Sequence, residues 1–374
     1  MIIYYLIFIT ISLLAYKEIY KPKPLNIYSF IFLTILLSIF IGLRNEIGCD
    51  WAGYKKIFMQ TNCVPNIGNK NLCDTSFILR TNDFGSIIDY LRFKEVGYSL
   101  VNLLTRSIGG NFYLANYFSS LLFILPLLYF CTNLKRPFLA ILVSYPYLIT
   151  VIGLGTIRQS IAISMLMISI TELRNLRFYK FYLYSLSASL FHISSSIFAF
   201  LPLLLNNKKN KKIRISKKIL VIVFFIFSLV FLIYDNNFIS SKIAGYDNDY
   251  SEYSIVSPFL IWIMIAFPSA IILFDYKDFK KDDIHKFWRN FSIVGILMFF
   301  SVFINKVVAL RLLLFFIPIK IYALSYIPEI KRFQNYTKNI YLAIIFLSLS
   351  ILTIWLNFAN HSYCYLPYKN LLLK

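Results

Sequence analysis

Long apolar runs separated by short polar segments make up most of this chain. The runs lie at 2–16, 27–43, 112–131, 137–154, 157–173, 178–204, 219–235, 255–275, 288–304, 310–327 and 339–357. A helix that spans a bilayer needs about 20 mostly apolar residues, with about 17 as the usual lower limit. Because most runs approach this length, the pattern predicts an all-α, polytopic integral membrane protein with about 11–12 transmembrane segments. We expect residues 1–374 to form a single membrane domain, in which a long outer loop, 44–111, separates the second and third helices.

The composition agrees with a membrane protein, and the distribution of charge indicates which loops face the cytoplasm. Apolar residues make up 59% of the chain and charged residues 15%, whereas a soluble domain carries roughly 45–50% and about 25%. A formal charge of +21 can indicate nucleic-acid binding, but here Lys and Arg lie between the apolar runs, as in the cytoplasmic loops of membrane proteins. We therefore expect no nucleic-acid partner. The first run has no basic residue before it and no small-residue cleavage site after it, so we expect a retained helix rather than a signal peptide.

The run 178–204 is long for one transmembrane helix and short for two. Arg174 and Arg177 precede it, and seven Lys or Arg residues follow it within 208–218. A single crossing would place that basic segment outside, against the positive-inside rule. A broken hairpin that turns near His192 keeps both flanks inside. Because short arms are tolerated in a membrane only when they are buried in protein or face water, the hairpin also predicts a polar cavity that opens to the outside.

With this hairpin, the basic residues concentrate in one set of loops. The predicted cytoplasmic loops are 17–23, 135–136, 172–180, 206–218, 275–289 and 328–338. Residues near Asn207 should therefore be cytoplasmic, and residues near Thr61 should lie outside. Lys320, in the middle of an apolar run, is interpreted as a lysine that snorkels to the cytoplasmic side.

The predicted outer side keeps few ionisable residues within or next to apolar segments. They are Arg44, Asp50, Glu95, Arg158, His192, Lys306 and Arg311. Such residues are costly near a membrane and by default mark a functional site. Each also has a simpler interpretation, since arginines can snorkel from helix ends, a histidine can donate a hydrogen bond between packed helices, and carboxylates can be ion-pair partners of arginines.

Taken together, the cations Arg44, Arg158, Arg311 and His192 suit an anionic ligand with several oxygens. Arginine binds phosphate bidentately and stays charged in a low-dielectric site, and a lipid-linked pyrophosphate is such a ligand at a membrane surface. A carboxylate among cations stays ionised, so Asp50 or Glu95 can take the proton of a sugar hydroxyl as general base. We expect supporting roles for Tyr54, Tyr98, Gln159 and Lys306.

Neither a metal nor a cofactor is expected. The histidines, His192, His285 and His361, are scattered over different predicted sides of the membrane, and a metal site needs clustered ligands. No glycine-rich phosphate loop is found, which argues against a sugar-nucleotide donor. Two inserted cysteines of the outer loop, Cys63 and Cys73, can form a disulfide in an oxidising compartment or remain free thiols.

The order of these residues resembles the EpsG family, which belongs with the Wzy-like polysaccharide polymerases. The resemblance rests on Gly42-x-Arg44-x-x-x-Gly48-x-Asp50-x-x-x-Tyr54, then Glu95-x-Gly97-Tyr98, Arg158-Gln159, Phe191-His192 and Arg311. It implies a multi-pass protein of the bacterial inner membrane whose active site faces the periplasm or the exterior. There a growing glycan would move from undecaprenyl pyrophosphate onto an incoming lipid-linked repeat unit, to build exopolysaccharide, capsule or O-antigen.

The same resemblance implies roles and partners. Arg44, Arg158 and Arg311 would bind the donor and acceptor pyrophosphates, with His192 as a further donor or a positioning residue. Asp50 or Glu95 would be the base. The partners would be undecaprenyl-pyrophosphate-linked glycans and the lipid bilayer, together with a flippase and a chain-length regulator. The long outer loop with its two cysteines departs from the family pattern.

Two other classes of protein remain open at this stage. A flippase or transporter for the same lipid-linked oligosaccharide would also need a cation-lined cavity, but it usually carries inverted repeats with paired broken helices, and only one broken segment is apparent here. Another membrane glycosyltransferase or ligase would use a different lipid-linked donor or a different acceptor.

Overall fold

The computed structural model describes residues 1–19, 25–60, 63–64, 72–73, 96–205, 256–274, 283–304 and 306–373. The elements of the first half are α1 (Ile2–Lys17), α2 (Ile27–Gly42), α3 (Trp51–Gln60), β1 (Cys63–Val64), β2 (Leu72–Cys73), α6 (Val96–Ser107), α7 (Phe112–Thr132), α8 (Pro137–Ser144), the π-helix η1 (Tyr145–Ile152), α9 (Gly153–Gly155) and α10 (Ile157–Arg174). Those of the second half are α11 (Phe178–Phe191), the 3-10 helix η2 (Ile193–Leu204), α14 (Val256–Phe274), α16 (Asp283–Leu297), η3 (Met298–Phe300), α17 (Ser301–Ile304), α18 (Lys306–Leu314), α19 (Ile317–Tyr326), η4 (Ile327–Glu329), η5 (Lys331–Tyr336), α20 (Thr337–Phe358), η6 (Ser362–Tyr365) and η7 (Leu371–Leu373).

The predicted all-α, polytopic architecture is confirmed. Within the described ranges, six helical segments are long and apolar enough to cross a membrane: Phe112–Thr132, Pro137–Gly155, Val256–Phe274, His285–Phe303, Val308–Glu329 and Lys331–Phe358. Three shorter apolar helices accompany them: Ile2–Lys17, Ile27–Gly42 and Ile193–Leu204. The predicted run 219–235 lies outside the described residues, so the number of crossings stays a prediction.

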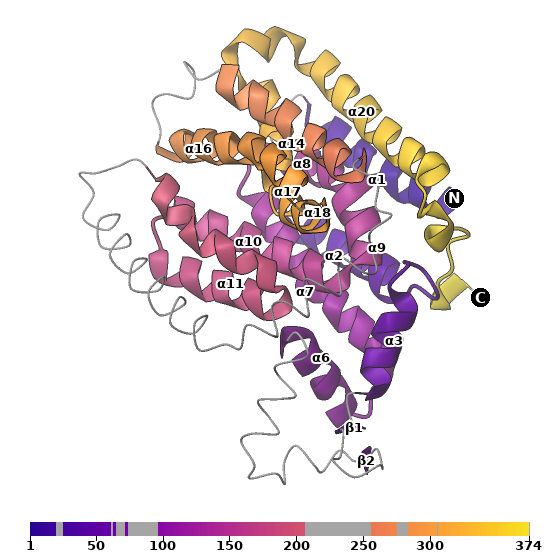
Figure 1. The fold of residues 1–374 in the computed structure, drawn as a ribbon. Helices are drawn as coiled ribbons and strands as arrows, with labels where there is room; N and C mark the ends of the chain where they lie inside the picture. Colours follow the sequence, from indigo (N-terminus) through magenta and orange to yellow (C-terminus); the bar gives the residue numbers. More distant parts are fainter. Residues whose placement is uncertain are drawn as a thin grey trace.

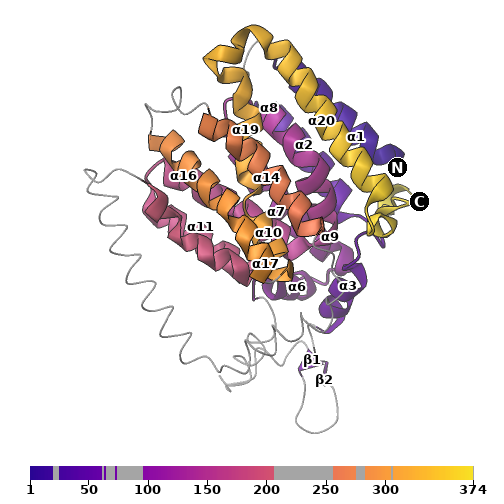
Figure 2. The same cartoon turned by 45° about the horizontal axis from the view of Figure 1, so that its top comes forward.

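The segment Pro137–Gly155 forms the centre of the bundle. It is 89% buried inside the protein, whereas the outermost segment, Lys331–Phe358, is 28% buried. α10 packs against α7 and α11. α7 also contacts α8 in the central segment, and α2 packs against α7. α20 lies along α1 at the edge of the molecule, and both chain termini lie near the same end of this pair (Figures 1 and 2).

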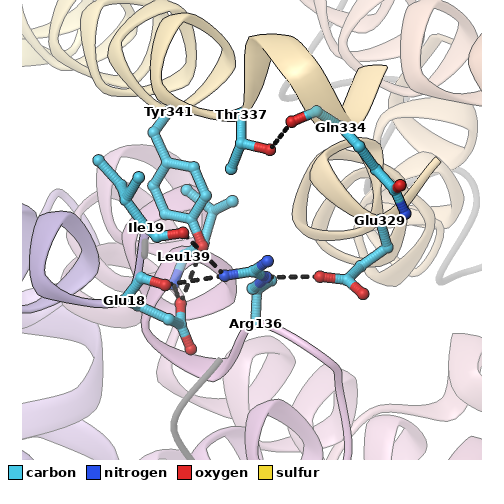
Figure 3. A network of polar contacts seen from close by, with 8 residues as sticks. All are labelled: Glu18, Ile19, Arg136, Leu139, Glu329, Gln334, Thr337 and Tyr341. Atoms are coloured by element: carbon cyan, nitrogen blue, oxygen red, sulfur yellow. Dashed lines mark hydrogen bonds and ion pairs between the residues drawn. The ribbon is translucent and has the colours of Figure 1, made fainter. Parts of the chain in front are cut away.

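A polar network joins three loops that the charge pattern assigns to the cytoplasmic side (Figure 3). At its centre, Arg136 donates from Nε to Oε1 of Glu329 at 2.6 Å and from Nη1 to the carbonyl of Glu18 at 2.8 Å. The Glu18 carboxylate accepts hydrogen bonds from the Leu139 backbone N–H at 3.2 Å and from the Tyr341 hydroxyl at 3.4 Å. Burial raises the pKa of Glu18 to about 7. These three predicted inner loops therefore meet at one end of the bundle.

The predicted loop 172–180 lies at this same end. Arg174 donates to the carbonyl of Asn133 at 3.1 Å, next to the loop that carries Arg136. The buried Glu172 accepts a hydrogen bond from the Tyr129 hydroxyl at 3.1 Å. The predicted loop 206–218, with Asn207, lies outside the described residues.

The interpretation of Lys320 as a snorkelling residue is wrong. Its side chain is only 5% exposed and lines a small apolar pocket with Tyr147 of η1 and Ile265 of α14. The orientation of α19 turns this lysine toward the centre of the bundle, and hydropathy along a single helix does not report such an orientation.

The broken hairpin predicted near His192 is confirmed. α11 ends at Phe191, His192 has extended backbone angles (φ −153°, ψ 116°), and η2 begins at the next residue. η2 then packs against α11, α10 and α16, and the carbonyl of Leu204 at its end accepts a hydrogen bond from the Asn290 side chain of α16 at 2.8 Å. The imidazole is 7% exposed, and its centroid lies 5.8 Å from that of Phe315. The ring is therefore enclosed by protein, whereas the expected open cavity would have exposed it.

Candidate functional site

Gly48 brings the first motif of the sequence to the start of α10. Its φ of +95° favours glycine, and a Cβ at this position would collide with the carbonyl oxygen of Leu154. Only Thr156 separates α9 from α10. This close approach places the segment that carries Asp50 beside Arg158, at the opposite end of the central helix from Arg136.

Gly97 makes a second close contact between predicted motifs. A Cβ there would lie 2.9 Å from the ring of Phe191, the residue that ends α11 before the turn at His192. The start of α6 is thereby pressed against the hairpin turn. Glu95, the second candidate base, lies outside the described residues, so its position relative to Gly97 stays a prediction.

Three basic side chains act electrostatically to lower the pKa of the Asp50 carboxyl: Arg158, Arg311 and His361. They come from three separate parts of the chain, since Arg158 is in the first turn of α10, Arg311 is in α18 and His361 follows α20. Gln159 connects the first two, because its amide Nε2 donates to the carbonyl of Arg311 at 2.9 Å. Both arginines are half-buried. The arrangement is suited to hold an anionic group next to a carboxylate.

The Asp50 side chain remains open to solvent at the edge of this cluster. Crowding by the surrounding protein raises the pKa of the Asp50 carboxyl, while Arg158, Arg311 and His361 act in the opposite direction. The carboxyl group is therefore both accessible and strongly influenced by its neighbours, and perturbed ionisable groups of this kind are common at functional sites.

Two tyrosines separate this cluster from Arg44. The guanidinium Cζ of Arg158 lies 5.5 Å from the ring centroid of Tyr54, and the rings of Tyr54 and Tyr98 meet edge-on at 5.3 Å. Both tyrosines are buried. The supporting residues Tyr54, Tyr98 and Gln159 thus lie around Arg158, while Lys306 is exposed at the first position of α18.

Arg44 is fully buried, with an exposed fraction of 0%. Its Nη1 donates to the carbonyl of Ile41 at 2.6 Å and its Nε to that of Ile47 at 3.1 Å, and its Cζ lies 5.5 Å from the Trp51 ring centroid. Among the described residues, its Nη2 has no hydrogen-bond partner. Arg44 thus organises its own loop, and its environment differs from that of the half-buried Arg158.

The C-terminal segment 359–373, here called the strap, forms a part of the site that the sequence did not predict. A disulfide joins Cys49 to Cys364, with their Cα atoms 5.2 Å apart and a sequence separation of 315. The backbone N–H of Gly48 donates to the Cys364 carbonyl at 2.9 Å, and that of Asn45 donates to the Lys369 carbonyl at 3.0 Å. The strap is thus paired along the loop between α2 and α3.

Tyrosines anchor the strap to the bundle. The Tyr365 hydroxyl donates to the carbonyl of Val151 in the π-helix η1 at 3.0 Å, and the Tyr4 hydroxyl donates to the carbonyl of Tyr365 at 2.8 Å. The Tyr368 hydroxyl donates to the carbonyl of Phe40 at 2.7 Å. The sequence signal for this element is the presence of Cys49 and Cys364, whose pairing the sequence does not specify.

Two remaining expectations concern cysteines and metals. The register of β1 and β2 pairs Cys63 with Cys73 across an antiparallel ladder, which agrees with a disulfide at the level of the backbone, and the bond itself stays a prediction. Within the ranges that the structure describes, no three side chains of His, Cys, Asp or Glu are grouped to hold a metal ion. The expectation of a metal-free, cofactor-free protein also stays a prediction.

Comparison with known proteins adds a family. A model of the EpsG family matches residues 27–370. The matched range contains all the motif residues from Gly42 to Arg311 and also most of the strap. Searches among curated proteins and among solved structures found no match.

Proposed function

The chain belongs to the EpsG family, which is related to the Wzy-like polysaccharide polymerases, and from this premise we propose that it is a lipid-linked oligosaccharide polymerase. Its substrates would be undecaprenyl-pyrophosphate-linked repeat units, and its product a surface polysaccharide. Family membership supports a glycosyltransferase-like role at the membrane. The observation that carries the finer proposal is the electrostatic influence of Arg158, Arg311 and His361 on the Asp50 carboxyl, in a segment that Gly48 brings against the start of α10.

The proposed reaction is a glycosyl transfer. A hydroxyl oxygen of the acceptor forms a bond to the anomeric carbon of the donor, and the bond from that carbon to the pyrophosphate oxygen breaks, with its electron pair leaving on the phosphate. The hydroxyl proton passes to Asp50. Arg158 and Arg311 would stabilise the charge that grows on the leaving pyrophosphate, because fixed cations act most strongly where charge develops in the transition state.

The other predicted site residues take supporting roles in this proposal. Tyr54 packs under Arg158 and fixes its direction, and Gln159 ties α10 to α18. His192 is a positioning residue at the hairpin turn, since its ring is enclosed. Arg44 holds the loop that presents Asp50 through its hydrogen bonds to the carbonyls of Ile41 and Ile47.

The disulfide supports an outer-face site. Disulfides form and persist in oxidising compartments and are rare in the cytosol, and the bond between Cys49 and Cys364 lies next to Asp50. Predicted cytoplasmic loops meet at the other end of the molecule, around Arg136. We therefore propose that the site faces the periplasm or the exterior of a bacterial inner membrane.

Loss of this disulfide should weaken polymerisation. We expect Cys49→Ser, Cys364→Ser and the double variant to reduce the amount of long-chain polysaccharide equally, because each removes the same bond. A disulfide typically contributes about 2–4 kcal/mol, which here would hold the strap against the loop. Gel analysis of surface glycan measures the effect, and Cys131→Ala, which removes the buried free thiol of α7, is the matched control. If the double variant still made full-length polysaccharide, the strap would keep its position against the loop without the disulfide.

A deletion strain tests the function itself. If the protein is the polymerase, deletion should abolish long chains while single repeat units still reach the surface on their normal acceptor. Loss of all surface glycan, with lipid-linked repeat units retained inside, would favour a flippase. Full-length glycan that accumulates on its lipid carrier would favour a ligase.

A further inference from the structure

The short helix α6 turns its polar face toward the protein and its apolar face outward. Leu100 and Leu104, one turn apart, are 46% and 66% exposed, whereas Ser99, Asn102 and Thr105 are buried. This pattern is the reverse of that of a surface helix in a soluble protein, and it suits a helix that lies in the membrane interface with its leucines in lipid. Both views show α6 beside α3 at one end of the bundle (Figures 1 and 2). The polar face of α6 is therefore directed toward the interior at this end.

Asn102 on α6 and Asn116 on α7 lie at the same level of this pair of helices. Because α6 ends at Ser107 and α7 begins at Phe112, the connection is short and α7 runs back along α6. Both asparagines are equally far from Gly109 along the chain. Each has an exposed fraction of 0%. The two helices thus carry two buried amide side chains at one level.

Helix α3, which directly follows Asp50, packs on both α6 and α7. The ring centroids of Trp51 and Phe112 lie 4.8 Å apart, and those of Tyr54 and Tyr98 lie 5.3 Å apart. Each asparagine follows its helix's contact residue by one turn. Because α6 and α7 run in opposite directions, both asparagines lie between these two contacts with α3. The Cζ of Arg158 lies 5.5 Å from the Tyr54 centroid, so the amide pair is near the proposed pyrophosphate position.

The amide groups of Asn102 and Asn116 are not used to hold the helices together. Within the described ranges, none of their four polar atoms makes a hydrogen bond of normal geometry. Buried asparagines in membrane proteins normally bond across helices, and a buried polar group without a partner is unfavourable. An amide donates and accepts at once, as a sugar hydroxyl does, whereas a pyrophosphate oxygen only accepts. An uncharged sugar therefore fits this pair better than a second phosphate.

We propose that Asn102 and Asn116 form a sugar-binding subsite, a proposal that rests on the proposed polymerase function. Their amides bind hydroxyl groups of the sugar attached to the pyrophosphate that Arg158 holds. They thereby fix the position of that sugar and contribute to the choice of repeat unit. The subsite is closed in this structure and opens by a shift of α6, which is not one of the six segments long enough to cross a membrane.

Equilibrium binding to purified full-length protein in lipid nanodiscs tests the subsite with two probes. One probe is undecaprenyl pyrophosphate, which carries no sugar, and the other is the lipid-linked repeat unit extracted from the deletion strain. Asn102→Leu and Asn116→Leu replace an amide by an apolar group of similar size. Each should bind the repeat unit about 10-fold more weakly, because hydrogen bonds to the sugar are lost, and should bind undecaprenyl pyrophosphate normally. Arg158→Ala should weaken the binding of both probes.

The matched controls are Thr105→Val on α6 and Ser119→Ala on α7. Both hydroxyls are buried, but each donates within its own helix, Thr105 to the carbonyl of Val101 at 2.8 Å and Ser119 to that of Ala115 at 2.8 Å. Neither substitution should change the binding of either probe. Thermal unfolding checks that every variant is folded, and where a leucine variant is not, alanine at the same position supplies the comparison.

Normal binding of the repeat unit in either asparagine variant, which is the result expected if the amides bind only buried water, would overturn the proposal. An equal loss of both probes would also overturn it, because the asparagines would then support the structure of the site rather than the sugar. In both cases the polymerase function would stand. If the unchanged protein binds neither probe, the proposed function itself fails.

Discussion

Arg158→Ala should abolish long polysaccharide chains, although the protein should still insert at normal abundance. Arg158, in the first turn of α10, acts to lower the pKa of Asp50 and lies over the ring of Tyr54, where the proposed pyrophosphate leaves. Removal of one fixed donor to a developing charge typically costs about 10²–10³ in kcat. Arg158→Lys keeps the charge but loses the bidentate fork, so polymerisation should fall yet remain detectable. The measurements are gel analysis of surface glycan and immunoblotting of membranes.

The matched control for this prediction is Arg174→Ala at the other end of the same helix. Arg174 donates to the carbonyl of Asn133, remote from the proposed site, so its loss should leave chain length unchanged. A decisive second variant combines Arg158→Ala with Asp50→Asn. If this pair regained long chains, Arg158 would be an ion-pair partner of the carboxylate, and its assignment to substrate would be wrong.

Asp50→Asn should reduce polymerisation by about 10²–10⁴-fold, the usual contribution of general acid–base catalysis. The amide preserves the size of the side chain but cannot accept a proton. Because crowding by the surrounding protein raises the pKa of the solvent-accessible Asp50 carboxyl, the activity of the unchanged protein should fall on acidification at a pH above the ordinary range of an aspartate. The pH–rate profile of the purified protein measures this limb, which should be absent from any residual activity of Asp50→Asn.

Glu46→Gln is the control in the same loop. Its carboxylate is exposed and pairs at the surface with Lys369 at 3.1 Å, and such pairs contribute about 0–1 kcal/mol. Chain length should therefore stay normal. If Asp50→Asn kept its activity and Glu95→Gln lost it, Glu95 would be the base instead.

The membrane architecture could be predicted from the sequence because its requirements are local. A spanning helix satisfies its own backbone hydrogen bonds and needs only a sufficient apolar length, so segments such as Phe112–Thr132 and Val256–Phe274 are visible in hydropathy. The hairpin at His192 was predicted from the basic residues on both of its flanks. This signal is also local, because the positive-inside rule depends on the charge of individual loops. The grouping of Asp50 with Arg158 and Arg311 was expected because all three residues were predicted to lie on the outer side of the membrane.

The tertiary structure decided which residues that are far apart in the chain come into contact. Cys49 pairs with Cys364 across 315 positions, and neither spacing nor periodicity specifies such a partner, because it depends on how the terminal helices pack. The same packing brings Asp50 under the electrostatic influence of His361, encloses Arg44 while it leaves Arg158 half-buried, and turns Lys320 inward. The sequence by itself determined which segments are long and apolar enough to cross a membrane and which residues between them carry charge. The packing of the helices determined which of those charges meet, since contacts between distant helices depend on their rotation and proximity, and a one-dimensional pattern records neither.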